Sequence, residues 1–495
     1  MAFARLVGRP ARRHRFRSEV AHMGKSRRLA AIVCCVALSA LLAGCVASKK
    51  TNSDPKKNAG AKKVSLTINA NDVVGGKNAA EAGWINNYVI PGFVKAQQAK
   101  GVTATVKFNG AGVDDEQFKT KLELGLKTGN SADVFSGDGI WLGELASAGY
   151  VKPLDQVVGK SADDWNGWSQ ISESVQQNMS YKDKRYGIPS GTDGRVLYFN
   201  KKLFAQAGLP TDWQPKSWQD ILTAGAALKK ISGVNPIQIN AGTPMGEATT
   251  AQGFLPLLAG TGKPLFDEAS GKWQGATSNV TAVLDFYKKI YGTGLGDPNL
   301  QRDKAGRDES FADFSKGKIG ILLEGDYFWR SIICPDKTIC NTTAMANRNA
   351  EVGYTKIPAE KPGSGIKGQD FVSISGGGGW LLNPASKFPQ QAWELMQFMM
   401  SAEAQTTLAR AEIRISPRAD VNAQTLTGDP LMSYISKTIL PITSYRPSDQ
   451  NYNAVSVAIQ EATAAVISGK TASSAAGTYQ SSLQKAVGDA HVEAG

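Results

Sequence analysis

The stretch Val64-Ser-Leu-Thr-Ile-Asn-Ala-Asn71 decides the fold. Its apolar residues alternate with polar ones, which predicts a half-buried β-strand. Residues 79–98 then carry apolar side chains at helical spacing, and 102–108 is again strand-like. A second helical stretch, 116–127, and a short buried strand, 132–135, follow. Strands that alternate with helices indicate a parallel sheet and therefore an α/β fold.

A parallel sheet also predicts where a ligand binds. Ligands of such sheets lie at the carboxyl ends of the strands. Polar or flexible loops follow the predicted strands at Asn71-Asp72, Asn109-Gly-Ala111 and Ser136-Gly-Asp138. We therefore expect Asp72 and Asp138 at the site, with Trp141 shortly after the last loop.

The first 45 residues have the pattern of an export signal. Lys25-Ser-Arg-Arg28 is positively charged, and the apolar run 29–42 is too short to span a bilayer. The end of this run, Leu41-Leu-Ala-Gly-Cys45, resembles the bacterial lipobox, in which the cysteine is acylated and becomes the new N-terminus. The alternative is an ordinary signal peptide with a chance cysteine, and the spacing of the charged region, the apolar run and the cysteine favours the lipobox. We predict a signal peptide over 1–45, a start at Met23, and a lipid-anchored protein on the extracellular face of the bacterial cell membrane.

The net charge of +13 belongs to the N-terminal part. Residues 1–45 hold nine Lys or Arg against one Glu, and residues 46–63 hold six lysines against one Asp, so residues 64–495 are neutral. A nucleic-acid partner therefore loses its electrostatic support. Residues 46–63 have hardly any apolar side chain and are expected to form a disordered tether.

The supply of cysteine and histidine limits the chemistry. Cys34 and Cys35 leave with the predicted signal peptide and Cys45 is predicted to carry the lipid, so Cys334 and Cys340 are the cysteines that remain. Outside the cell, two cysteines at this spacing indicate a small-loop disulfide. His491 is then the single histidine. Too few histidines and cysteines remain for a Ser-His-Asp catalyst, a His-ligated metal or a zinc site. We therefore expect no cofactor, no metal and no enzymatic activity.

The stretch Tyr186-Gly-Ile-Pro-Ser-Gly-Thr-Asp-Gly-Arg-Val-Leu-Tyr-Phe-Asn200 reads as a strand entered through a Gly/Pro-rich segment. It resembles the first inter-lobe crossing of bacterial extracellular solute-binding proteins, the sugar-binding family of ABC importers that includes maltose-binding protein. Other parts of the chain resemble this family in the same order. They are 132–155, 200–218, the recrossing strand Phe314 to Gly325, and the glycine-rich strand Ser375 to Lys387 with the helix 390–400.

The resemblance implies two α/β lobes joined by three crossings, with a ligand cleft between them. Its boundaries are expected to be discontinuous. We place the N-lobe at 64–188 and 325–400, and the C-lobe at 189–324 and 401–495. The segment 341–368 is longer than in the best-known members of the family. The resemblance therefore does not define the rim of the N-lobe.

Sugars need flat aromatic rings against their C–H faces and planar or charged groups around their hydroxyls. Asp193 and Arg195 point to one face of the crossing strand and either bind the ligand or pair with each other. Arg414, after the last crossing, is a further candidate. Gly376 to Gly379, with Gly378 at its centre, would let the main chain approach a ligand. Trp380 faces either the cleft or the core.

An aromatic and acidic cluster follows the recrossing strand. It consists of Glu324, Asp326, Tyr327 and Trp329. Because the family has stacking residues here, Glu324, Tyr327 and Trp329 are ligand candidates. The other interpretation is that these rings pack around the Cys334–Cys340 loop.

We expect a monomeric receptor that delivers a carbohydrate, an oligosaccharide above all, to ABC permease subunits with a cytoplasmic ATPase. Two alternatives from other classes remain. One is a binding protein for a sugar phosphate or a polyamine, and the other is a secreted glycoside hydrolase that uses Glu and Asp. Asp193 beside Arg195 favours a polar, neutral ligand.

Overall fold

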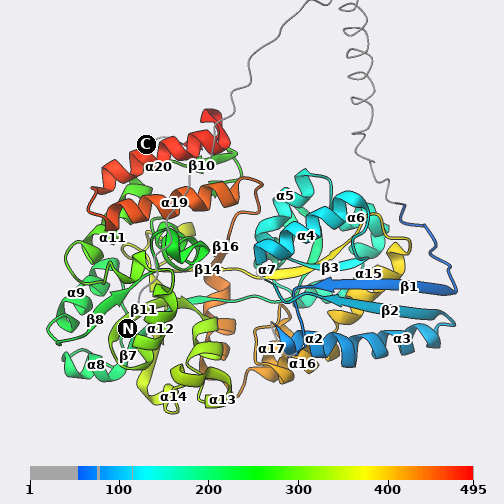
Figure 1. The fold of residues 1–495 in the computed structure, drawn as a ribbon, viewed down its shortest axis with the longest axis horizontal. Coiled ribbons are helices and arrows are strands. Elements are labelled where there is room, and N and C mark those ends of the chain that lie inside the picture. The colour runs from blue at the N-terminus through cyan, green and yellow to red at the C-terminus, as the bar shows by residue number, and fades with distance from the viewer. Residues whose placement is uncertain (1–53, 75–77, 114, 494–495) are drawn as a thin grey trace, which may run out of the picture. The chain divides into compact units, whose positions relative to one another are not determined.

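The computed structural model describes residues 54–74, 78–113 and 115–493. Residues 52–495 form one compact unit (Figure 1). The predicted signal peptide, Cys45 and residues 46–53 of the predicted tether lie outside the described residues. The expectation of disorder is wrong for the rest of the tether, 54–63, which is held against the N-lobe: Asn58 donates to the Lys387 carbonyl at 2.8 Å, and Gln390 donates to the Pro55 carbonyl at 2.9 Å. Among the residues that are described, no helix combines the length and the apolar character that a membrane span requires.

The N-lobe is built on a five-stranded sheet in the order β2-β1-β3-β15-β6. Strand β1 pairs in parallel with β2 and with β3, and β15 runs antiparallel to both β3 and β6. The parallel units predicted from the sequence are therefore confirmed. The strands are β1 (Lys63–Ala70), β2 (Thr103–Gly110), β3 (Val134–Asp138), β6 (Gly187–Pro189) and β15 (Gly378–Leu382).

Helices cover both faces of this sheet (Figure 1). Val134 of β3 contributes to the core beneath α3 and α15, and the next residue, Phe135, contributes to the core beneath α4 and α5. Burial on both faces is the reason why two apolar residues follow each other at the start of this strand. The helices are α2 (Ala79–Trp84), α3 (Ile90–Ala99), α4 (Asp115–Thr128), α5 (Leu142–Ser147), α6 (Leu154–Val158), α7 (Glu173–Gln177), α15 (Pro389–Met399) and α16 (Ala402–Ala411), and a hairpin is formed by β4 (Ser180–Tyr181) and β5 (Lys184–Arg185).

The C-lobe is built on a four-stranded sheet in the order β12-β7-β11-β8, with β12 at one edge. Leu197 and Phe199 of β7 join a core with α9, α11, α19 and α20, whereas Val196 and Tyr198 join a core on the other face. The strands of this sheet are β7 (Arg195–Asn200), β8 (Asn235–Gln238), β11 (Ile319–Gly325) and β12 (Val352–Thr355).

Further elements complete the C-lobe. The strands β13 (Ile357–Pro358), β14 (Phe371–Ser375) and β16 (Thr443–Tyr445) form one small sheet, and β9 (Phe266–Asp267), β10 (Lys272–Gln274) and β17 (Val492–Glu493) form another. The helices are α8 (Lys201–Gln206), α9 (Trp218–Leu228), α10 (Leu255–Gly260), α11 (Ser278–Tyr291), α12 (Gly306–Ser315), α13 (Lys337–Cys340), α14 (Arg348–Glu351), α18 (Pro430–Tyr434), α19 (Tyr452–Ile467) and α20 (Ala472–Val487). Helix α17 (Ala419–Thr425) packs against α16.

Strand pairing corrects the predicted second part of the N-lobe. We expected all of 325–400 there, but β12 pairs with β7 and β14 pairs with β16, so both strands belong to the C-lobe. Only β15 and α15 of this stretch join the N-lobe. Helix α16, expected in the C-lobe, also packs in the N-lobe core. A strand pattern does not reveal which sheet the strand joins, which is why the boundary was misplaced.

Two of the crossings lie against each other. Gly377 follows β14 with φ of +128°, in the region that favours glycine. A Cβ atom on Gly377 would lie 2.5 Å from the carbonyl oxygen of Gly191, in the crossing between β6 and β7. The glycine run was expected to let main chain approach a ligand. In this structure it lets one crossing approach the other.

Candidate functional site

Arg446 joins the two lobes. It follows β16 of the C-lobe, and its Nη2 donates at 3.1 Å to Asp138, at the carboxyl end of N-lobe strand β3. Its Nη1 donates at 3.3 Å to Glu247, a C-lobe residue. The hydroxyls of Tyr452 and Ser456, both on α19, also donate to Glu247, at 2.5 and 2.7 Å. We call these five residues the Arg446 cluster.

The Arg446 cluster is buried and electrostatically balanced. The Arg446 side chain is only 9% exposed. Burial lowers the pKa of its guanidinium, but Asp138, Tyr452 and Glu247 outweigh burial and raise the pKa above its usual value. Burial and Glu247 likewise raise the pKa of the Tyr452 hydroxyl, so it stays a neutral donor. A fixed cation between carboxylates and hydroxyls can exchange hydrogen bonds with a hydroxylated ligand.

Asp193 and Arg195 pair with each other at the first crossing. Asp193 also accepts a hydrogen bond from the Gly376 amide at 2.6 Å, and Arg195 donates to the Ile374 carbonyl at 3.2 Å. Arg195 is 4% exposed, whereas the Asp193 side chain is 31% exposed. The pair therefore ties two crossings together, and Asp193 keeps accessible surface.

A chain of ion pairs runs from the C-lobe to helix α2 of the N-lobe. Asp326 accepts from Arg330 at 3.3 Å, and Arg330 donates to Glu412 at 3.2 Å. Glu412 then pairs with Arg414 at 2.8 Å, and Arg414 pairs with Glu81 of α2 at 2.9 Å. Arg414 was expected to bind the ligand, but the structure engages it with two carboxylates at the last crossing.

Two members of this chain of ion pairs, Asp326 and Arg414, have shifted pKa values. Burial lowers the pKa of Arg414, but Glu81 and Glu412 outweigh burial and raise it above the usual value. Burial raises the pKa of Asp326 to about 6, opposed by Arg330 and supported by the nearby charge of Asp193. The ionised form of Asp326, which lies beside the crossing where the lobes meet, is therefore less stable than it would be in water.

The three tryptophans expected to stack on a sugar are buried. Trp141 is 5% exposed and packs against Phe118, with ring centroids 6.3 Å apart. Trp380 is fully buried in the N-lobe core. Trp329 is fully buried in the C-lobe, where its Nε1 donates to Asp429 at 3.0 Å. Trp380 thus lies in the core, which is one of the two surroundings predicted for it, and the stacking role of Trp141 and Trp329 stays a prediction.

The remaining predicted residues differ in their surroundings. Glu324 is fully buried and takes two hydrogen bonds from Arg307, at 2.9 and 3.0 Å. Gly378 pairs with Asp138 in the sheet. Asp72, two residues after the end of β1, accepts a hydrogen bond from Asn78 at 2.9 Å. Tyr327 is 45% exposed beneath Arg330, whose guanidinium carbon lies 5.8 Å from the ring centroid. Tyr327 alone among these candidates offers an open aromatic surface.

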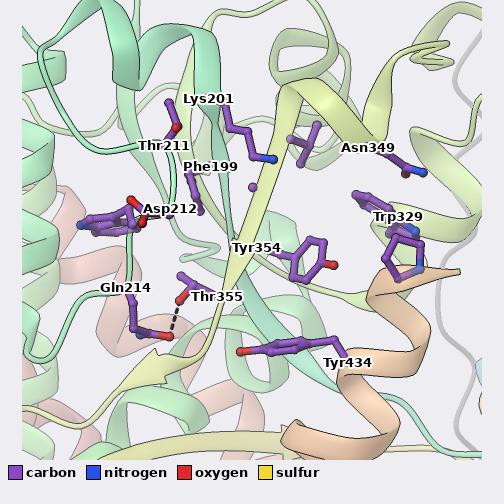
Figure 2. Close-up of a pocket in the computed structure, with 14 residues that line it drawn as sticks. Phe199, Lys201, Thr211, Asp212, Gln214, Trp329, Asn349, Tyr354, Thr355 and Tyr434 are labelled. Atoms are coloured by element: carbon purple, nitrogen blue, oxygen red, sulfur yellow. Dashed lines mark hydrogen bonds between the residues drawn. The ribbon is translucent and has the colours of Figure 1, made fainter.

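Trp329 instead lines a cavity of about 430 Å³ that lies within the C-lobe (Figure 2). The structure joins Cys334 and Cys340 by a disulfide, and both cysteines are buried in the same lobe. Within the described ranges, no group of His, Cys, Asp and Glu side chains could hold a metal ion.

Sequence reasoning missed Arg446, Glu247 and Tyr452. A signal for the first exists in Ser444-Tyr-Arg-Pro447, where an aromatic residue and an arginine precede a proline in a polar stretch. Glu247 lies in a polar segment before an apolar run and carries no comparable signal. Arg446 reaches Asp138 from the segment after β16, and Glu247 is held beside Arg446 by Tyr452 and Ser456 of α19.

The lobes, their crossings and the shared Arg446 cluster define the class, a two-lobed α/β protein of the periplasmic-binding-protein type. The GacH receptor of Streptomyces glaucescens, solved unliganded and with acarbose, has a TM-score of 0.65 at 22% identity, covering 86% of this chain and 99% of that one. MalE of Xanthomonas citri has a TM-score of 0.67 at 14% identity, covering 85% of this chain and 96% of that one. At these low sequence identities, the structural similarity to the two proteins establishes the fold of this chain.

The chain belongs to the bacterial extracellular solute-binding protein family, whose model matches residues 78–406. It is 23% identical over 296 residues to the diacetylchitobiose binding protein DasA of Streptomyces coelicolor, covering 59% of this chain and 61% of DasA. It is also 23% identical over 283 residues to a binding protein of Brucella abortus, covering 57% and 62%. The chain thus spans about three fifths of the length of these curated relatives.

Proposed function

We propose that this protein is a lipid-anchored receptor that binds a carbohydrate, an oligosaccharide above all, between its lobes and delivers it to an ABC permease. The observation that supports this most directly is the Arg446 cluster. It brings the strand-end carboxylate Asp138 of one lobe and Glu247 of the other to a single cation. A site shared by both lobes couples ligand binding to lobe closure.

Neutral sugars suit this chemistry. Arg446 and Asp193 offer a donor and an acceptor for sugar hydroxyls, and Tyr327 offers an exposed ring beside Asp326. Hydrogen bonds to charged groups contribute about 1.5–3 kcal/mol each, and about −8 kcal/mol gives micromolar affinity. A few such bonds with one stacked ring are therefore sufficient. The contacts that Arg446 now makes within the protein are the ones a hydroxylated ligand would replace.

The family and the resemblance of 41–45 to a lipobox support the proposed anchoring and delivery. A maltooligosaccharide-transporter relative of Streptococcus pneumoniae is a solute-binding lipoprotein, 23% identical over 325 residues. By the same chemistry Cys45 of this chain would carry the lipid, on the extracellular face of the membrane. The permease subunits and their cytoplasmic ATPase would supply the energy for transport.

A sugar phosphate is the second candidate ligand. A glycerol-phosphate binding protein of Yersinia enterocolitica is 32% identical over 142 residues, covering 27% of this chain and 29% of its own. Arg446 is a cation that a phosphate could contact. However, Asp138 and Glu247 already balance its charge, which favours a neutral ligand.

Calorimetric titration of the full chain tests the proposal, with maltose, maltotriose, diacetylchitobiose and sn-glycerol 3-phosphate as ligands. We expect micromolar binding of a sugar and at least about tenfold weaker binding in Asp138→Asn, because a charged hydrogen bond is lost. Asp183→Asn is the matched control, since Asp183 is an exposed acid in the β4–β5 turn of the same lobe.

The sugar should be recovered uncleaved by chromatography. Binding of the phosphate alone would move the assignment to the second candidate. Cleaved sugar would identify a hydrolase, and absence of heat from every ligand would contradict both candidates.

A further inference from the structure

A cavity of about 430 Å³ opens on the C-lobe and involves none of the residues of the Arg446 cluster. Its volume lies within the range of small-molecule sites. Four groups from different elements surround it (Figure 2): Lys201, the first residue of α8, Asp212 from the loop between α8 and α9, Tyr354 from the edge strand β12, and Tyr434 from the end of α18.

Buried aromatic side chains hold the cavity walls in place, and two of them, Phe199 and Trp213, belong to its lining. Trp213, next to Asp212, packs against Phe199 and Phe204, with ring centroids 5.6 and 5.1 Å apart. Asn200 caps α8 by accepting from the Leu203 amide at 3.1 Å, which fixes the turn that carries Lys201. Because Phe199, Phe204 and Trp213 are buried, the side chains of Lys201 at the start of α8 and Asp212 in the following loop have little conformational freedom.

Two tyrosines form the aromatic side of the cavity. The ring centroids of Tyr354 and Tyr434 lie 5.3 Å apart, and Tyr354 packs edge-on to Trp329 at 5.6 Å. Both tyrosines are partly exposed, in contrast to Trp329. Burial and the neighbouring Tyr354 raise the pKa of the Tyr434 hydroxyl to about 12, so it remains a neutral hydrogen-bonding group. The cavity therefore offers both ring surface and hydroxyls.

The charges of the cavity cancel. Among the described residues that line it, only Lys201 and Asp212 are ionised, and they have opposite signs. Within the described part of the chain neither forms an ion pair, unlike the charged members of the Arg446 cluster. An anion would meet the carboxylate and a cation would meet the ammonium. A neutral ligand with several hydroxyls can donate to Asp212 and accept from Lys201 at the same time.

We propose that this cavity is a second carbohydrate site, which binds one neutral sugar unit against Tyr354 and Tyr434 with its hydroxyls shared by Lys201 and Asp212. The site uses residues of the C-lobe alone. It binds independently of lobe closure and does not depend on the function proposed above. Sites of this kind hold a ring by its C–H face and are weak individually, so its affinity is expected in the millimolar range.

The test uses the full chain labelled with 3-fluorotyrosine and observed by fluorine NMR. Tyr354→Phe and Tyr434→Phe assign the two signals, and glucose, N-acetylglucosamine and maltose are the probes. We expect both signals to shift saturably with at least one sugar. Lys201→Gln and Asp212→Asn should each raise the half-saturating concentration by about tenfold or more, since each removes a charged hydrogen bond.

Lys202→Gln is the matched control, because Lys202 is the next residue of α8 and does not line the cavity. It should leave the titration unchanged. Asp138→Asn should also leave it unchanged, which separates this site from the one between the lobes. Inorganic phosphate is titrated as a charged comparison ligand. The proposal is overturned if no sugar shifts the two signals, if only phosphate shifts them, or if Lys201→Gln and Asp212→Asn titrate like the unsubstituted chain.

Discussion

Two buried arginines, Arg348 and Arg446, have similar exposure but different surroundings. The Arg348 side chain is 7% exposed, pairs with Asp429 at 3.3 Å, and lies over the Trp329 ring at 3.8 Å, all within the C-lobe. The Arg446 side chain is 9% exposed and pairs with Asp138 of the N-lobe and Glu247 of the C-lobe. One arginine belongs to the core of a lobe, and the other belongs to the contact between lobes.

The difference teaches what each charge can do. When both partners lie in one core, the pair breaks only if that core unfolds, so it contributes to the stability of the lobe. When the partners lie in different lobes, the pair can break by lobe opening while each core remains intact. Burial alone therefore does not separate a structural ion pair from one that responds to a ligand.

The largest effect is expected for Asp429→Ala. Burial lowers the pKa of Arg348, and Asp429 opposes this, so removal of Asp429 leaves a buried guanidinium without its partner. Trp329 Nε1 and the Met432 amide also lose their acceptor. We expect a loss of about 3–5 kcal/mol in the free energy of unfolding, measured by denaturant titration. A loss below about 1 kcal/mol would show that the Arg348–Asp429 pair contributes no more to stability than an exposed ion pair does.

The second prediction concerns Asp326, a C-lobe residue at the start of the chain of ion pairs that reaches the N-lobe. It is tested by the pH dependence of the free energy of unfolding. Its pKa in the folded protein is about 6, against the usual 3.8, so the folded state binds its proton more tightly than the unfolded state. Stability from this group is therefore complete below about pH 4 and is lost as the pH rises through about 6, by up to about 3 kcal/mol.

The charges that face Asp326 are Arg330, Asp193 and Arg195. Asp326→Asn should remove this part of the pH dependence, because the amide does not titrate. The measurement is the unfolding free energy of both proteins at several values between pH 4 and 7. Parallel curves for the two proteins would contradict the assignment.

A smaller stability effect, with a larger change in conformation, is expected for Arg446→Met. Glu247 keeps its bonds from Tyr452 and Ser456, and Asp138 keeps the bond from the Ile140 amide at 3.1 Å. We expect a loss of about 1.5–3 kcal/mol. Small-angle X-ray scattering should show a larger radius of gyration, as the lobes separate. An unchanged radius together with a loss as large as that of Asp429→Ala would make Arg446 a core residue.

The smallest effect is expected for Lys100→Ala. Lys100 and Glu394 pair at 3.0 Å with side chains 58% and 37% exposed, so water screens their attraction. We expect less than about 1 kcal/mol in the unfolding free energy. This variant sets the baseline for the buried pairs, and a loss above about 2 kcal/mol would show that exposure does not order these effects.

Several elements were predictable because their signals are local. Alternation over 64–71 predicted β1, and the helical spacing at 116–127 predicted α4 within one residue at each end. The parallel pairing of β1 with β2 and β3 followed from the order of elements. Asp138 was expected at a strand end and lies there. These features depend on neighbours in the chain, whose spacing is visible in the sequence.

The roles of the tryptophans and arginines were not predictable in this way. Trp329 follows a crossing strand as expected, but its ring turns into a core completed by Asp429, 100 residues later. Arg446 meets Asp138, which lies 308 residues earlier. Which face of an element is covered, and by which partner, depends on the packing of distant segments.

The sequence by itself determined the α/β class, the neutral charge of residues 64–495, and the scarcity of histidine. Composition and periodicity are properties of the chain before it folds. The tertiary structure alone decided that β12 and β14 join the C-lobe, that Arg446 connects the lobes, and that Lys201 and Asp212 share a cavity with two tyrosines. These facts arise from contacts between segments far apart in the chain, and no local pattern encodes such contacts.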